Sequence, residues 1–345
     1  MFLEEIEKDE IGYVEYCKNK VKEYFVNFFD KKYEKQIEHK INRVHLIFLD
    51  KCASKMCAQD SFSQNKYISK FYNKLYKVFQ RTIFKDYSNF ISEFNTSGCY
   101  CSIGSVDNEK DSVEYIIYEY ITSVTQSAFV HELLHCISSQ VFLHEHRIYR
   151  TNEDIERACK SGLKFNFITK NKYIIIKNKL LNEVFTDYVA INITDQMCKD
   201  NLELFSKKIT DSIYSYCFVL IKPLFDKYFD AFKDFYLNDD ETKLDNFFGK
   251  ENINELDDIL NNFLGYSKSL DQKGVLNRLN CNTFKDGLNE RKTSNDKEIK
   301  IVLKKYYNSF VQMKNLMEKI DTHVEKNKFD WIMQLSKNMV NVFKR

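Results

Sequence analysis

Residues 129–137 have the sequence Phe129-Val130-His131-Glu132-Leu133-Leu134-His135-Cys136-Ile137. On a helix, His131 and His135 project from one face about one turn apart, because positions i and i+4 are surface neighbours. Two imidazoles so placed reach one tetrahedral Zn²⁺ ion, while Glu132 leans toward the attacking water as a general base. The pattern is short, and chance produces it in roughly one chain in a hundred of this composition. Its surroundings therefore decide its meaning.

The surroundings predict a strand followed by a helix. Residues 113–121 are rich in β-branched and aromatic side chains, which is typical of a strand. Thr122, Ser123 and Thr125 offer N-cap hydroxyls for a helix that runs to about Val141. We expect five apolar residues to form its buried stripe, namely Phe129, Val130, Leu133, Leu134 and Ile137. The histidines share the other side with small residues, which leaves room for a ligand; the alternative is a helix with two hydrogen-bonded core histidines.

A second motif lies downstream, Leu181-Asn182-Glu183-Val184-Phe185-Thr186-Asp187-Tyr188. A catalytic zinc site takes three protein ligands and keeps one position open, so a third ligand is required. Glu183 and Asp187 are four residues apart and share a helix face, which suits Glu183 to bind the metal and Asp187 to accept an N–H from a ligating imidazole. The apolar neighbours are expected to pack this helix against the first: Leu180, Leu181, Val184, Phe185, Tyr188 and Val189.

His-Glu-x-x-His followed by Asn-Glu-x-x-Thr-Asp resembles the gluzincin branch of the zincin metallopeptidases, the thermolysin-like group. The resemblance covers roughly residues 113–195. It implies that His131, His135 and Glu183 are zinc ligands, that Glu132 is the general base and that Asp187 orients a histidine. It also implies a peptide or protein substrate, which in this family pairs with an edge strand of the sheet.

The chain departs from the family pattern in the spacing of the two motifs. Forty-seven residues separate His135 from Glu183, more than in typical thermolysin-like proteins. Glu153 and Asp154 are nearer acidic candidates for the third ligand, Asp154 at the spacing of aminopeptidase-type gluzincins, but neither is followed by an acidic residue as in the Asn-Glu-x-x-Thr-Asp arrangement. The metzincin pattern is excluded, because it requires glycine at position 138 and histidine at position 141, where the chain has serine and valine.

Composition excludes several classes of function. Lys plus Arg number 52 and Asp plus Glu 50, and no basic run with interleaved aromatics occurs, so we expect no nucleic-acid partner. No stretch of about eighteen apolar residues is present, which predicts no membrane span. The first residues lack the basic and apolar regions of a secretory signal. Ten scattered cysteines in a long chain without such a signal favour reduced thiols, and we expect a cytoplasmic protein.

The patterns predict an α+β, zincin-like fold with a small sheet beside the histidine-bearing helix and largely helical N- and C-terminal parts. Its strands are expected at 44–49, 99–103 and 113–121. The three expected regions are a mostly helical one with one strand at 1–95, a catalytic core at 96–236 and a helical subdomain at 237–345. Helices are further expected over 1–40, 65–94, 202–236 (two, with Pro223 in a first turn or at a kink), 253–264, 297–325 and 329–343.

The long segment between the motifs is expected to contain a hairpin of residues 165–169 and 173–176. This hairpin leads into the Glu183 helix and is placed to overhang a cleft. In gluzincins a tyrosine or histidine donor stands opposite the base and stabilises the oxyanion. The candidates for that role are Tyr173, Tyr149 and His146, and the sequence does not choose among them.

Together these observations predict a zinc-dependent metallopeptidase that hydrolyses peptide bonds with a metal-activated water and Glu132 as the base. The alternative from another class is a non-catalytic protein, toxin-like or regulatory, that uses a zincin scaffold for binding. Hydrolysis of a non-peptide amide is a third hypothesis.

Overall fold

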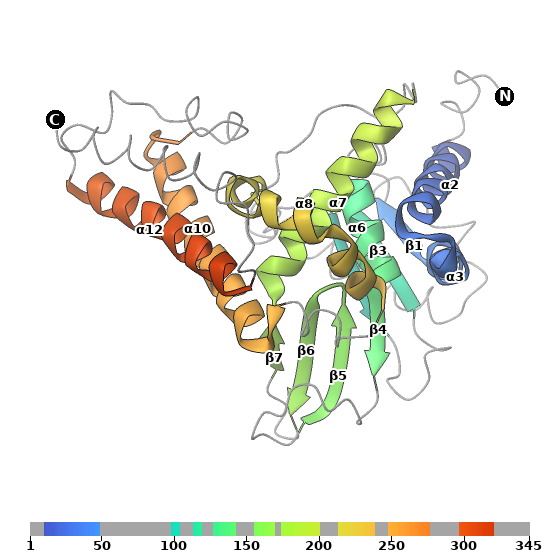
Figure 1. Ribbon diagram of the computed structural model, residues 1–345. Helices are drawn as coiled ribbons and strands as arrows, with labels where there is room; N and C mark the ends of the chain where they lie inside the picture. Colours follow the sequence, from blue (N-terminus) through green and yellow to red (C-terminus); the bar gives the residue numbers. More distant parts are fainter. Residues whose placement is uncertain are drawn as a thin grey trace, which may run out of the picture. The chain divides into compact units, whose positions relative to one another are not determined.

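The computed structural model describes residues 10–48, 98–103, 113–118, 127–142, 155–169, 174–200, 213–238, 248–276 and 297–320 (Figure 1). These residues form helices and two separate sheets, so the expected α+β class is confirmed at that level. The chain divides into two compact units. The first consists of Met1–Ile137 and Ala190–Ile209, and the second of Ser138–Val189 and Thr210–Arg345. Helix α7, Lys179–Lys199, contributes residues to both.

The first unit begins with the helices α2 (Glu10–Phe29), η1 (Lys31–Tyr33) and α3 (Glu34–Arg43). The helical spacing of apolar residues predicted this region; Val14, Cys17, Val21 and Phe25 are buried as expected, whereas Phe29 is buried in place of the expected Phe28, which is half-buried. The predicted helix at 65–94 lies outside the described residues.

Three of the described strands form a mixed sheet in this unit: β1 (His45–Phe48), β2 (Gly98–Ile103) and β3 (Val113–Tyr118). Their order is β1-β3-β2, with β1 parallel and β2 antiparallel to β3. All three strands were expected from their β-branched and aromatic content. Ile116 of the central strand β3 is fully buried.

Helix α6 carries the two histidines and spans Ser127–Ser138. The expected end near Val141 is wrong, because the chain continues from Ser139 to Phe142 as strand β4. Pairing of β4 with the neighbouring strand β5 (Ile155–Ser161) satisfies the backbone groups that a longer helix would have bonded internally. The Ile137 carbonyl, near the end of α6, accepts a hydrogen bond from Gln36 Nε2 of α3 at 3.2 Å.

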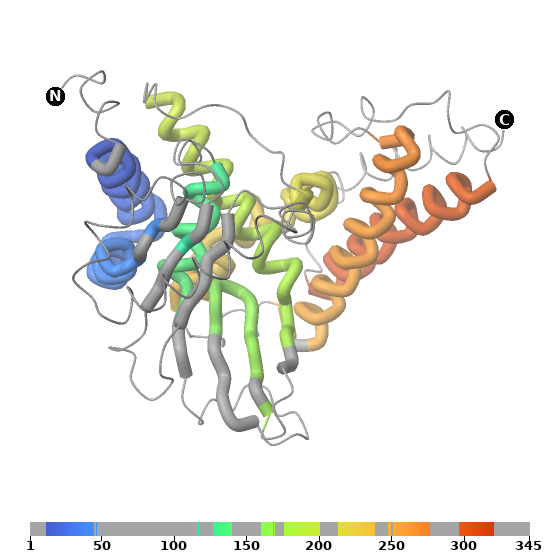
Figure 2. Tube along the Cα trace, turned by 180° about the vertical axis from the view of Figure 1, so that it is seen from behind, coloured from blue at the N-terminus to red at the C-terminus, as the bar shows by residue number. Residues whose placement is uncertain are grey.

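In the second unit, β4, β5, β6 (Lys164–Thr169) and β7 (Ile174–Lys177) lie side by side in that order, each antiparallel to the next (Figure 1; Figure 2 gives the view from behind). The β6–β7 pair confirms the predicted hairpin. Strands β4 and β5 were not predicted, because β5 (Ile-Glu-Arg-Ala-Cys-Lys-Ser) lacks the strict alternation of apolar and polar residues that marks a half-buried strand.

This sheet explains how the long segment between the two motifs returns to its starting point. Ser139 pairs with Ser161, Ser161 with Lys164, and Phe165 with Lys177, so these residues lie at one end of the sheet. Because the four described strands alternate in direction, the chain enters and leaves at that end. The start of β4 and the end of β7 are separated by three strand spacings, about 14 Å. The end of α6 and the start of α7 therefore stay close, despite the length of the segment.

The remaining described helices are α8 (Ser215–Leu237), α10 (Lys250–Gln272) and α12 (Lys297–Ile320). Pro223 lies inside α8, and the helical dihedrals are interrupted at Tyr228 (φ −112°, ψ 25°). The short helix predicted at 253–264 is longer in the structure, where α10 continues through Gly265 to Gln272. The region predicted as helix at 329–343 is not described.

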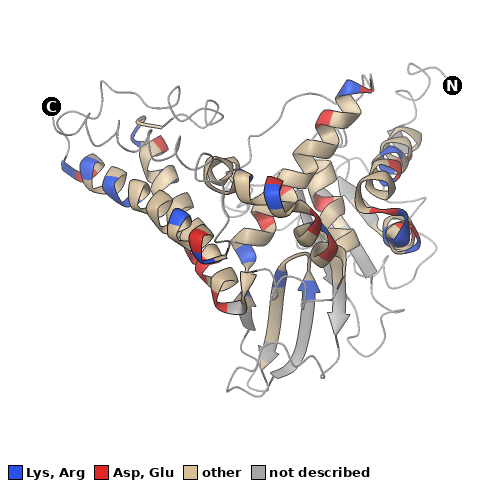
Figure 3. Ribbon diagram, in the orientation of Figure 1, with Lys and Arg blue, Asp and Glu red and all other residues tan. Residues whose placement is uncertain are grey.

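Helices α10 and α12 pack as an antiparallel pair. Lys273 binds Glu298 at 2.7 Å at one end of the pair, and Lys319 binds Glu255 at 2.9 Å toward the other. Figure 3 shows such charged positions along both helices. Their facing sides bury aromatic rings, with Phe263 stacked on Tyr306 at a centroid distance of 4.6 Å. Within the part of the chain that is described, no helix combines the length and apolar character needed to cross a bilayer.

Candidate metal centre

Helix α6 is buried all round, from Phe129 to Ser138. The predicted stripe is confirmed, since all five of its side chains have no exposed surface. The ionisable residues are buried as well: His131 is 7% exposed, Glu132 8% and His135 6%. Ionisable groups in such a place cost stability that apolar residues would not cost. Such buried groups are therefore candidates for a functional site.

The two histidines face each other. Their Nε2 atoms are 3.0 Å apart, with ring centroids at 4.7 Å and ring planes at 80°. This distance suits a hydrogen bond in which one Nε2 carries the proton and the other accepts it, and which ring is the donor depends on the tautomer. Binding of a cation would require both Nε2 lone pairs to face the ion, with the protons on Nδ1.

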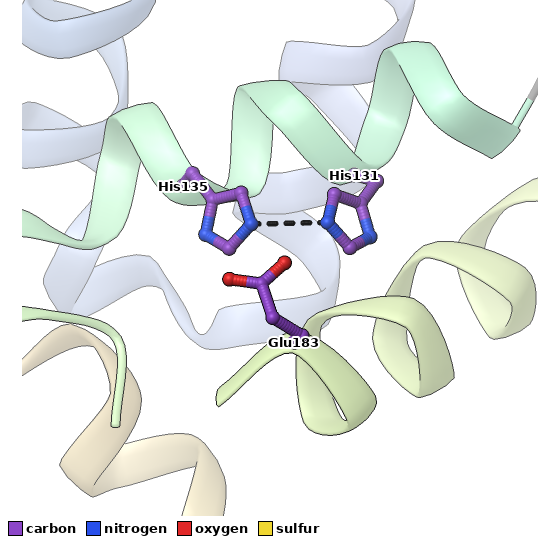
Figure 4. Close-up of side chains that lie close together, drawn as sticks. All are labelled: His131, His135 and Glu183. Atoms are coloured by element: carbon purple, nitrogen blue, oxygen red, sulfur yellow. Dashed lines mark hydrogen bonds between the residues drawn. The ribbon is translucent and has the colours of Figure 1, made fainter. Parts of the chain in front are cut away.

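The third member of the group is Glu183 on α7. One ligand atom from each of His131, His135 and Glu183 lies within 4.8 Å of the others. Figure 4 shows the Glu183 carboxylate directed toward the paired imidazoles. Within the described residues this is the one group of three histidine, cysteine or acidic side chains suited to holding a metal ion. The competing candidates Glu153 and Asp154 lie outside those residues.

The group fits a tetrahedral ion. Zinc binds imidazole nitrogen at 2.0–2.1 Å, which places two nitrogens on a tetrahedral ion about 3.3 Å apart. The observed separation of 3.0 Å needs little adjustment. Glu183 is half-buried, and its three rotatable side-chain bonds allow its carboxylate to close on the same point. Two imidazoles and one carboxylate form a donor set found in catalytic zinc sites.

The second motif has two faces with different partners. Glu183 and Asp187 form one i, i+4 pair, and Asp187 is 6% exposed. Asn182 and Thr186 form the other pair and are fully buried. Asn182 Oδ1 accepts the backbone N–H of Leu163 at 2.7 Å. Thr186 Oγ1 is 2.8 Å from the Tyr236 hydroxyl and donates to the Asn182 carbonyl at 2.8 Å. The second pair thus attaches α7 to the β5–β6 turn and to α8.

Gly162 allows this close approach. It has φ +62°, a conformation that L side chains rarely adopt. A Cβ atom there would lie 2.2 Å from Asn182 Oδ1 and 2.4 Å from the Tyr236 ring. The turn between β5 and β6 therefore packs on α7 only with glycine at this position.

Apolar packing also holds the face of α7 that carries Asn182 and Thr186. The Phe185 ring lies 5.1 to 5.4 Å from those of Phe225, Tyr236 and Phe232 of α8. The expected apolar positions of α7 are buried at Leu180, Leu181, Val184, Phe185 and Val189. Tyr188 is half-buried, and its hydroxyl donates to Asp226 at 2.6 Å. These aromatic contacts attach α7 to α8 within the second unit.

Two buried cysteines near the motifs are poor metal ligands. Cys136 follows His135, but its Sγ points to the Lys40 carbonyl of α3 at 3.8 Å. Burial raises the pKa of the Cys217 thiol on α8; Lys268 lowers it, and the charges of Asp187 and Asp257 raise it. Metal binding requires the thiolate, which such an environment disfavours. Both cysteines are free thiols.

The candidate oxyanion donors Tyr173, Tyr149 and His146 all lie outside the described residues. Comparisons with protein-family models, with characterised proteins and with solved structures find no match to this chain. The interpretation of the site therefore depends on its own residues and on the physical chemistry of their arrangement.

Proposed function

We propose that the chain is a zinc-dependent metallopeptidase in which His131, His135 and Glu183 bind the metal and Glu132 is the general base. The observation that carries the proposal is the grouping of one ligand atom from each of the three proposed ligands within 4.8 Å. This donor set leaves a tetrahedral position open for water or substrate. The buried Glu132, placed between the two histidines in sequence, supplies the base that hydrolysis requires.

Zinc held by these three residues would lower the pKa of a coordinated water to about 7 and polarise the substrate carbonyl. Glu132 accepts the proton of the attacking water and delivers it to the departing amine nitrogen. Because Glu132 is only 8% exposed, bulk water competes little with this transfer. In the metal-bound state Asp187 would accept an Nδ1–H from one ligating imidazole and so fix the tautomer with a free Nε2.

The first test is metal content. We expect one zinc ion per chain in protein purified without chelator, and loss of that ion in the single variants His131→Ala, His135→Ala and Glu183→Ala. The exposed His39, which is hydrogen-bonded to Arg43, provides the matched control, and His39→Ala should keep the metal. Two histidines and one carboxylate also bind Fe²⁺ in oxygenases. Stoichiometric iron, or zinc retained by the ligand variants, would contradict the proposal.

The second test is hydrolysis of a peptide library. Glu132→Gln should keep the zinc and reduce turnover about 10²- to 10⁴-fold, the usual contribution of a general base. Glu251→Gln, the same change at an exposed position of α10, should leave both unchanged. A wild-type protein that binds zinc and cleaves no peptide would overturn the peptidase assignment and favour the non-catalytic alternative.

A further inference from the structure

The N-terminus of helix α7 is capped in an unusual way. The Asn178 carbonyl accepts the first helical hydrogen bond, from the Asn182 N–H at 3.0 Å, so Asn178 is the N-cap residue. An asparagine there normally accepts from the second or third helical N–H, here those of Leu180 and Leu181. Asn178 instead has φ +54°, and its buried Oδ1 accepts no hydrogen bond from the described residues. The helix therefore lacks a cap from its own N-cap side chain.

Asp257 of α10 takes this role from a distant part of the chain. Its Oδ1 accepts the Leu181 N–H at 2.7 Å, and the carboxylate also accepts the Leu180 N–H. These are the two donors that a local N-cap side chain would satisfy. A carboxylate at this position also interacts favourably with the helix dipole. Asn261, one turn further along α10, donates to Asp257 Oδ2 at 3.3 Å and orients the carboxylate.

The cap lies next to the proposed metal ligand. Glu183 is two residues after Leu181, in the part of a helix that opens most readily when its N–H groups lack partners. Helix α10 is itself held in place, because it packs along α12 and is linked to it by two ion pairs. A fixed helix thus supports the turn that presents Glu183.

We propose that Asp257 is a positioning residue for Glu183. By capping the first turn of α7 from α10, it holds the Glu183 carboxylate in place beside the paired imidazoles. The inference rests on the proposed function, in which Glu183 is a metal ligand. Asp257 acts through the backbone of α7 and needs no contact with metal or substrate.

The test compares three variants of the full chain. Asp257→Ala removes the acceptor, Asp257→Asn keeps an Oδ1 that accepts the Leu181 N–H, and Ile259→Val mildly destabilises α10 at a buried position while leaving the cap intact. Zinc affinity is measured on folded protein by competition with a chromophoric chelator. We expect Asp257→Ala to bind zinc about tenfold more weakly, the lower end of the effect of residues that support a ligand. The other two variants should bind like the wild type.

A second measurement separates the cap from the metal. Amide hydrogen exchange in metal-free protein should accelerate over residues 179–188 in Asp257→Ala, and should not accelerate there in Asp257→Asn or over residues 127–138 in either variant. Unchanged exchange at 179–188 in the alanine variant overturns the inference whatever the metal result. Equal zinc affinity of wild type and Asp257→Ala overturns the inference and leaves the proposed function intact. A wild type that binds no zinc overturns the proposed function, and the ligand role of Glu183 with it.

Discussion

The two helices that supply the proposed ligands are held by different forces. Helix α6 is held largely by burial: its residues from Phe129 to Ser138 are all buried, and Gln36 adds one long-range hydrogen bond to the Ile137 carbonyl. Helix α7 is also packed, but its backbone and polar side chains are tied to partners 19, 50 and 76 residues away, through Leu163, Tyr236 and Asp257. Apolar burial places a helix by the pattern of its own sequence, whereas long-range hydrogen bonds place it by residues that no local pattern reveals.

We expect the largest loss of stability from removing apolar burial in α6. Leu133→Ala in α6 removes a fully buried side chain and should lower the free energy of unfolding by about 3 kcal/mol, because it loses transfer energy and leaves a cavity. Urea denaturation measures the change. The control is Ile301→Ala in α12, where the side chain is 57% exposed and the change should be close to zero. Equal effects at the two positions would show that burial does not hold α6.

Lys160 of β5 makes long-range hydrogen bonds of the kind that hold α7. Its side chain is fully buried, and its ammonium donates to the carbonyls of Phe235, Tyr236 and Asn238 at the end of α8. Lys160→Met keeps the length of the side chain and removes the donors. The free energy of unfolding should fall by about 2–3 kcal/mol, the usual loss for hydrogen bonds to a charged group. Lys164→Met in β6, a half-exposed position, should change it little. Comparable losses in the two variants would contradict a specific role for the Lys160 ammonium.

Thr186→Val tests a single long-range hydrogen bond of α7, the one between Thr186 and Tyr236 of α8. The variant loses the hydrogen bond to the Tyr236 hydroxyl and should be destabilised by about 1 kcal/mol. Thr194→Val on the same helix is the matched control, because the buried Thr194 hydroxyl bonds to the Ala190 carbonyl one turn earlier. Thermal unfolding should therefore show a larger decrease for position 186 than for position 194. A larger decrease for position 194 would mean that the hydrogen bond between Thr186 and Tyr236 contributes nothing to stability.

The smallest expected effect concerns pH. Burial raises the pKa of the Asp257 carboxyl above its ordinary value, and the Leu181 N–H only partly offsets it. A carboxyl with a raised folded-state pKa gives stability that is fully present below its unfolded pKa and is lost as pH rises through the folded one. Asp257→Asn removes this titration. The stability of the wild type relative to this variant should therefore increase between pH 7 and pH 4 in urea denaturation, and an opposite slope would contradict the raised pKa.

The sequence was sufficient for features that depend on local spacing. The five-residue stripe of α6, the strands of the mixed sheet and the β6–β7 hairpin all follow from periodicity and side-chain type. The grouping of His131, His135 and Glu183 was expected from two i, i+4 pairs and the ligand number of catalytic zinc. The stripe, the strands and the hairpin are predicted from residues within about one turn or one strand of each other, whereas the grouping joins two such motifs across 47 residues.

Features that depend on distant partners were not predicted. Strands β4 and β5 carry no clear alternation, and Lys160 in β5 resembles a surface residue until the end of α8 is known. Asp257 lies among other acidic residues of α10, and nothing near it in sequence indicates a bond to α7. Among these features, only the hydrogen bonds of Asn182 and Thr186 could have been anticipated from the sequence. Polar residues spaced i, i+4 and flanked by apolar ones often make buried hydrogen bonds.

The antiparallel sheet between α6 and α7 has a consequence for how this protein can vary. An even number of antiparallel strands returns the chain to the end of the sheet where it entered, whatever the length of the strands. A homologous or engineered sequence that lengthens paired strands equally would still return the chain to the end of the sheet where it entered, whereas two added strands would move the exit sideways by about 10 Å. Loss or gain of a single strand would deliver the acidic helix to the opposite end of the sheet, a full strand length from its partners.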